Sequence, residues 1–168
     1  ETYVQSTTDL KPYENITFGA GSHFPYDLTK YVGRSYSHIM ATPYGNSFTI
    51  EISKSALIAE QLGQDSVTDM LAISFSSPDY IGHTFGPNSI EAEDGFLRLD
   101  KELGEFFDFL DQKVGKGQYL LFLTADHGAA HVPGFLKEHK VPAGHINNEK
   151  LYNDLDSLLK TKFGKDNL

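Results

Sequence analysis

The 168-residue chain contains no cysteine, which excludes a disulfide framework and thiol chemistry and leaves the redox compartment open. It is also poor in basic residues, since 14 Lys and Arg stand against 23 Asp and Glu for a formal net charge of −9. A nucleic acid duplex needs clustered Lys and Arg on its partner, so this balance argues against one. No apolar run approaches the ~20 residues of a membrane-spanning helix, and we expect no membrane span.

The composition that remains is that of a globular domain, with 39% hydrophobic and 22% charged residues. The length suits one domain with a core of its own. The chain begins at Glu1, with neither an initiating Met nor a recognisable signal peptide. Either a leader was removed or the chain is a piece of a longer polypeptide.

The pattern of apolar residues changes after residue 41. Residues 1–41 mix Gly, Pro, Asn and Tyr without a sustained period and predict an irregular lead-in. Further along, apolar side chains recur at spacings of three and four in three stretches. This spacing predicts amphipathic helices that begin near Asn46, near Ser89 and at Glu149.

Two continuous apolar runs, residues 70–75 and 119–123, lie on either side of the second predicted helix. Such runs suit parallel strands that are covered on both faces. With the helix between them they predict an α/β fold, in which a βαβ-centred, mostly parallel sheet is flanked by helices. In sheets of this kind, ligands bind beyond the carboxyl ends of the strands.

An Asp/His pair follows each apolar run. Asp79 and His83 are four residues apart, whereas Asp126 and His127 are adjacent and precede Gly128. Carboxylate oxygen and imidazole nitrogen are the ligands that zinc takes in hydrolytic sites. Two such ligand sets build the two-metal centres of phosphoryl transfer. We therefore expect the four side chains to reach one crevice at the carboxyl edge of the sheet and to ligate metal.

Each pair also has a plainer explanation. Asp79 could cap its own turn while His83 is an ordinary surface histidine, and an Asp-x-x-x-His spacing is common by chance. The second pair could be a polar loop, but its place directly after a buried run makes that reading weaker. Because Gly128 has no Cβ, it permits a backbone bend that brings two adjacent side chains toward one ion.

The segments around the two pairs resemble the metal-binding motifs of the alkaline phosphatase superfamily. They are similar to those of its type I phosphodiesterase/nucleotide pyrophosphatase-like members, and most of all to those of phosphate-irrepressible bacterial alkaline phosphatases. The resemblance lies in Pro78-Asp79-Tyr80-Ile81-Gly82-His83-Thr84-Phe85-Gly86-Pro87 and Thr124-Ala125-Asp126-His127-Gly128. It implies that residues 42–168 are part of an alkaline-phosphatase-like α/β domain, and that residues 1–41 come from a cap or insertion region.

The resemblance also implies a function. Asp79 and His83 would bind one zinc ion, and Asp126 and His127 the second, in a secreted or periplasmic enzyme that hydrolyses small phosphate esters. A phosphomonoesterase of the alkaline phosphatase type is the first expectation. A phosphodiesterase or nucleotide pyrophosphatase of the same superfamily, or a non-catalytic α/β metal-binding module, is the alternative.

The family's nucleophile and its remaining ligands have no clear counterpart in the chain. The nucleophile, a Thr or Ser, is expected upstream, in other parts of a longer parent chain that contains this one as an internal fragment. Thr42 has a superficial claim to be the nucleophile but opens a Pro-Tyr-Gly turn, and a turn residue is the better interpretation. His131 and His145 could each be proposed as the missing ligand, although roles at the surface or beside the ligands fit them better.

The isolated chain is predicted to have no significant phosphatase activity, because it lacks a nucleophile and half of the ligands. The measurement is turnover of an aryl phosphate in the presence of zinc. Turnover that disappears in an Asp126→Ala variant would contradict this expectation.

Overall fold

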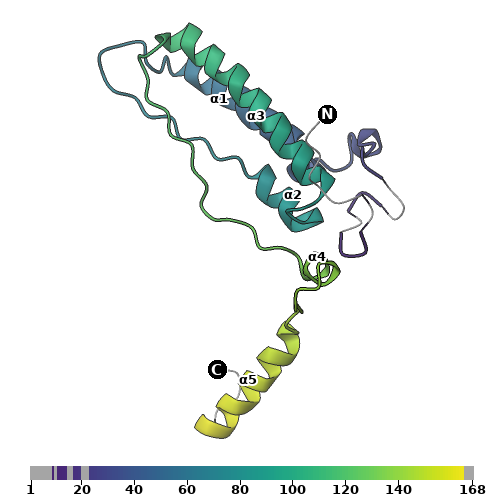
Figure 1. Ribbon diagram of the computed structural model, residues 1–168. Helices are drawn as coiled ribbons and strands as arrows, with labels where there is room; N and C mark the ends of the chain where they lie inside the picture. The colour runs from purple at the N-terminus through teal and green to yellow at the C-terminus, as the bar shows by residue number, and fades with distance from the viewer. Residues whose placement is uncertain (1–8, 10, 15–16, 20–22, 165–168) are drawn as a thin grey trace. The chain divides into compact units, whose positions relative to one another are not determined.

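The computed structural model describes residues 9, 11–14, 17–19 and 23–164. It divides into two compact units, Glu1–Val132 and Pro133–Leu168. The α-helices of the first unit are α1 (Tyr44–Ala59), α2 (Ser77–Phe85) and α3 (Ile90–Leu110), and those of the second unit are α4 (Pro133–Glu138) and α5 (Asn148–Phe163) (Figure 1). Two 3₁₀ turns, Thr29–Tyr31 and Ser37–Ala41, precede α1, and a π-helical turn, Asp111–Gly115, extends α3.

The helices predicted from apolar spacing are present, and their first residues lie close to the predicted ones. Ser89 caps α3, since its Oγ accepts a hydrogen bond from the backbone N–H of Ala92 at 3.1 Å, and Glu91 and Glu93 follow in the first turn. Asn147 caps α5 in the same way by accepting from the N–H of Lys150. None of the helices in the described ranges combines the length and apolar character needed to cross a membrane.

Helices α1 and α3 lie side by side (Figure 1) and form a first apolar cluster. Ile50 and Leu57 of α1 are buried against Phe106 and Leu110 of α3. Part of the first apolar run packs on this cluster through its half-buried side chains, Ile73 and Phe75.

Helix α2 packs against the N-terminal part of α3 and belongs to the second cluster. Its Ile81 and Phe85 are only 1% and 2% exposed, and they join Phe18 and Ala92. Glycine lets α3 approach Ile81 closely, because a Cβ on Gly95 would lie 3.0 Å from the Ile81 Cδ1 and the side chain would have to shift. The helix ends at Gly86, whose φ of 98° suits glycine.

The prediction of an α/β fold with a parallel sheet is wrong for this chain. Across the described residues the regular structure is helical, and the two apolar runs are irregular backbone. No backbone hydrogen bond joins residues 70–75 to residues 119–123. A strand is defined by such a ladder, whereas an apolar run reports only a preference for burial. Several of the side chains are exposed instead: Met70 89%, Leu120 79%, Phe122 83% and Leu123 71%.

A second correction concerns the first Asp/His pair. Asp79 and His83 were expected on a loop after a strand, but both lie within α2. Pro78 occupies the first turn of this helix, where its missing N–H costs no hydrogen bond and its fixed φ suits the helix. The expected division of the chain between residues 41 and 42 stays a prediction.

Replacing Ile81 with Ala should lower the free energy of unfolding of the chain by about 2–5 kcal/mol, because a buried side chain is removed from between α2 and α3. The matched control is Ile58→Ala on α1, where the side chain is 56% exposed and the change should stay within about 0.5 kcal/mol. Urea denaturation followed by circular dichroism gives both values. Equal losses in the two variants would show that α2 is not packed as described.

Candidate metal centre

Helix α2 carries Asp79 and His83 on its exposed side. Residues four apart lie above one another on a helix, and here the Asp79 Oδ1 is 3.4 Å from the His83 Nε2. The opposite side of α2 is held in the core by Ile81 and Phe85. The sequence thus fixes the helix through its apolar residues and leaves both polar side chains in solvent.

Asp126 and His127 lie on the irregular segment that follows the second apolar run. The His127 backbone N–H donates to the Asp126 Oδ1 at 3.1 Å, and the His127 Nδ1 lies 3.1 Å from the backbone carbonyl of Gly128. Because a carbonyl oxygen can only accept, Nδ1 carries the proton in this contact. The other ring nitrogen, Nε2, is turned toward the carboxylates and lies 3.5 Å from the Asp126 Oδ2.

The two pairs meet. The His127 Nε2 is 3.8 Å from the Asp79 Oδ1, which also faces the His83 Nε2. All four side chains are accessible, with exposed fractions between 48% and 89%. The structure therefore brings the four predicted residues together from α2 and an irregular segment, not from the edge of a sheet.

Zinc sets the separation between any two of its ligands. Two ligands at ~2.0–2.1 Å from a tetrahedral ion lie roughly 3.3 Å apart. The distances within the two pairs, 3.4 Å and 3.5 Å, are compatible with this value. However, no set of three or more His, Asp or Glu side chains in the described ranges is arranged to hold a metal ion as it stands. The donor chemistry fits zinc, and the role of these residues as ligands stays a prediction.

The electrostatics of this group favour a charged His127. The hydrogen bond to the Gly128 carbonyl and then the charge of Asp126 raise the pKa of the His127 imidazole above its ordinary value of 6.5; desolvation lowers this pKa by less, and Asp79 has the smallest effect, which raises it. Each of these contacts favours the protonated ring over the neutral one.

The other residues singled out from the sequence lie elsewhere or serve other contacts. Thr42 is buried, and its hydroxyl donates to the carbonyl of Ile39 at 2.8 Å. The His131 Nδ1 lies 2.7 Å from the Asn88 Oδ1. His145 is exposed and belongs to the second unit.

Two contacts beside the pairs were missed by sequence reasoning, namely the orienting carbonyl of Gly128 and the bond between Asn88 and His131. Backbone carbonyls carry no sequence signal. Asn88 gives no sequence signal of its contact with His131, because a polar residue after Gly86-Pro87 is typical of any turn.

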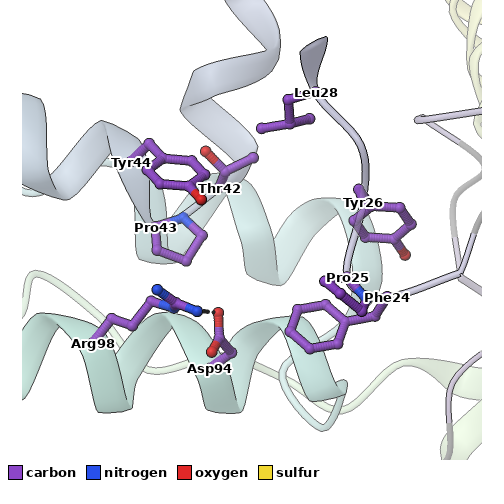
Figure 2. Close-up of a pocket in the computed structure, with 9 residues that line it drawn as sticks. All are labelled: Phe24, Pro25, Tyr26, Leu28, Thr42, Pro43, Tyr44, Asp94 and Arg98. Carbon is purple, nitrogen blue, oxygen red and sulfur yellow. Dashed lines mark hydrogen bonds and ion pairs between the residues drawn. The ribbon is translucent and has the colours of Figure 1, made fainter. Parts of the chain in front are cut away.

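A separate small cavity of about 70 Å³ lies between the lead-in, the start of α1 and α3 (Figure 2). Figure 2 shows Phe24, Pro25 and Tyr44 beside the ion pair of Arg98 and Asp94, in which the Arg98 Nε donates to the Asp94 Oδ2 at 2.8 Å. None of the four candidate ligands lines this cavity. Because the charged groups on its wall already satisfy each other, the cavity offers no unpaired charge for a ligand.

The chain was compared with known proteins. The family model described as type I phosphodiesterase / nucleotide pyrophosphatase matches residues 6–163. The alkaline phosphatase PhoV of Synechococcus elongatus is 56% identical over 164 residues, which are 97% of this chain and 30% of that protein. The alkaline phosphatase PafA of Elizabethkingia meningoseptica is 45% identical over 168 residues, which are 99% of this chain and 31% of that protein.

A solved structure is similar over the same span. The crystal structure of wild-type alkaline phosphatase PafA matches with a TM-score of 0.88 and 46% sequence identity, covering 99% of this chain and 32% of that one. The chain thus spans about a third of the length of the relatives that it matches.

The raised pKa of His127 predicts a pH dependence that can be measured in metal-free chain. Because the folded-state pKa lies above 6.5, the contribution of His127 to folding stability is fully present below that pH and is lost as pH rises through the raised pKa. An NMR titration should give a midpoint above 6.5 that falls in Asp126→Asn, without reaching 6.5 because the Gly128 carbonyl remains. The control, Asp100→Asn on α3, removes a charge that does not act on His127 and should leave the midpoint unchanged.

Proposed function

Because this chain belongs to the type I phosphodiesterase/nucleotide pyrophosphatase family, we propose that the complete protein containing it hydrolyses phosphate esters with two zinc ions. The chain would contribute one half of the metal site. Its relatives PhoV and PafA are named as alkaline phosphatases, which favours a phosphomonoesterase. The family description favours a phosphodiesterase as the second candidate.

The observation that carries this proposal is the meeting of the two Asp/His pairs. Asp79 lies within 3.8 Å of a histidine from its own helix and of a histidine from a segment more than forty residues away. Two carboxylates and two imidazoles gathered in solvent make a donor set suited to zinc. The same four residues carry the resemblance to the family's motifs.

The roles proposed for the four residues are those that the resemblance to the family's motifs implies. Asp79 and His83 would hold one zinc ion, and Asp126 and His127 the other. Bound zinc would supply positive charge that offsets the negative charge developing on the attacking and leaving oxygens. The Gly128 carbonyl would hold the His127 ring so that Nε2, and not Nδ1, faces the ion.

The remaining machinery is proposed to lie in the rest of the protein. Thr42 is unsuited to be the nucleophile, because its hydroxyl is buried and already donates to a carbonyl. A Thr or Ser outside this chain would take that role. The exposed apolar side chains of the second run, such as Leu120 and Phe122, would be covered by those other parts of the polypeptide. We place the enzyme outside the cytoplasm, secreted or periplasmic, and its substrates among small phosphate esters.

The complete protein should hydrolyse an aryl phosphate, lose that activity when a chelator removes zinc, and recover it when zinc is returned. Asp79→Ala, His83→Ala and Asp126→Ala should each lower kcat/KM by more than about 100-fold, because losing a ligand costs more than losing an outer partner of one. The matched control is His139→Ala, because this histidine is not one of the four proposed ligands and its Nδ1 lies 2.9 Å from the Phe135 carbonyl of its own helical turn.

Metal content measured on the same samples separates loss of zinc from loss of chemistry. Full activity in Asp126→Ala, or zinc-independent turnover, would contradict the proposal. Comparing an aryl phosphate with an aryl phosphodiester decides between the two candidate functions.

A further inference from the structure

The segment that carries Asp126 and His127 is fastened to the end of α2 by residues that follow the pair. The His131 Nδ1 lies 2.7 Å from the Asn88 Oδ1, and because an amide oxygen accepts, the imidazole donates. Next along the chain, Val132 covers Gly86, where the Val132 Cγ1 would lie 3.4 Å from a Cβ placed on the glycine. Both contacts lie within the first compact unit.

We propose that these two contacts form a latch that positions the Asp126–His127 segment against α2. Here the latch means the Asn88–His131 hydrogen bond together with the packing of Val132 on Gly86. His131 and Asn88 are thus positioning residues that act through His127, and neither is a ligand. The inference rests on the proposed function, since it states how the two halves of that metal site are held together.

The segment needs such a latch because little else holds it. Residues 124–130, which follow the apolar run, are all exposed, so this part of the segment gains almost nothing from burial. Helix α2, by contrast, is anchored by Ile81 and Phe85 in the core. At the contact of Asp79 with His127, a helix anchored in the core therefore meets an exposed irregular segment. The position of the segment is the one that further contacts must determine.

The latch is close enough along the chain to restrict both pairs. His131 lies four residues after His127, a span of at most ~14 Å of extended chain, and Asn88 lies five residues after His83. Fixing His131 to Asn88 therefore keeps His127 within about 14 Å of the latch, which limits how far it can move from α2. This confinement lowers the entropy that metal binding would otherwise have to remove.

Gly86 determines the path of the chain from α2 to Asn88. The glycine ends α2 with a φ of 98°, a conformation that side chains with a Cβ rarely adopt. The chain then turns through Pro87 and presents the Asn88 amide to His131. A Cβ at this position would meet Val132 only at an ordinary contact distance of 3.4 Å, so the backbone conformation, and not the space, is what favours glycine.

A competing role for His131 is direct coordination of zinc, and the two roles predict different results. A ligand would be damaged by every substitution that removes the imidazole. A latch donor would be restored by Asn, whose side-chain amide can donate from nearly the place of Nδ1. If His131 belongs to a latch, replacing Asn88 should lower zinc affinity as much as replacing His131 does. If His131 is a ligand, replacing Asn88 should have little effect on zinc affinity.

The test uses the complete protein and four variants, namely His131→Ala, Asn88→Ala, the double variant and His131→Asn. Zinc affinity is measured by chelator competition. We expect it to fall roughly 3- to 10-fold in each Ala variant, no further in the double variant, and hardly at all in His131→Asn. The control His139→Ala should match the unmodified protein. Additive losses in the double variant, or a His131→Ala loss as large as that of His83→Ala, would overturn the latch.

A second measurement does not depend on zinc or on activity. Spin labels at Tyr80→Cys on α2 and Ala129→Cys on the segment report their separation in metal-free protein, in a background without other cysteines. The distance distribution should broaden in His131→Ala and Asn88→Ala and stay narrow in His131→Asn. An unchanged distribution in both Ala variants would refute the latch even if the protein proves to be a zinc phosphatase. A protein that binds no zinc would refute the proposed function and leave this readout intact.

Discussion

The packing of α2 against α3 is the constraint on which the rest of the first unit depends. Ile81 fits against Gly95, where a Cβ would approach its Cδ1 to 3.0 Å, so the two helices meet closely at one point. Phe85, one turn further along α2, stacks with Tyr26, whose hydroxyl donates to the buried Glu91 of α3. Burial and then the bond to Glu91 raise the pKa of Tyr26, which keeps the hydroxyl protonated as a donor. Because these contacts fix the buried side of α2, the direction of Asp79 and His83 follows.

The sequence predicted the longer helices well and missed the one that matters most for the site. Helices α1, α3 and α5 carry enough apolar residues at spacings of three and four to be recognised. Helix α2 has only nine residues, and Gly82 in its interior is a poor helix former. Its start signal, Ser77 followed by Pro78, was visible in the sequence, but the same dipeptide also begins many turns. The burial of Ile81 and Phe85 in the core is what favours a helix over a turn in this segment.

The error over the sheet has a different cause. An apolar run carries information about where its side chains prefer to lie, and none about which backbone will receive its hydrogen bonds. Residues 70–75 and 119–123 are apolar enough for burial, yet no ladder joins them in this chain. The four candidate ligands nevertheless lie together, and for a reason other than the expected one. Residues four apart lie on the same side of a helix, so Asp79 and His83 are close together on α2. The prediction had expected them to be close because both would follow the end of a strand at one edge of a sheet.

The two halves of the candidate site consequently differ in stability. Asp79 and His83 stand on a helix whose other side is in the core, so they keep their geometry without a ligand. Asp126 and His127 stand on an exposed segment. Its side chains reach α2 through the contact of His127 with Asp79, and the turn after α2 through the hydrogen bond of His131 with Asn88. An ion held by Asp126 and His127 would therefore have to complete the ordering of a segment that the latch only restricts, and its affinity would include that remaining cost. A substitution in the turn from Gly86 to Asn88 can then alter metal affinity although it changes no ligand. It does so by changing how ordered the segment is before metal binds, as well as by changing contacts in the metal-bound state.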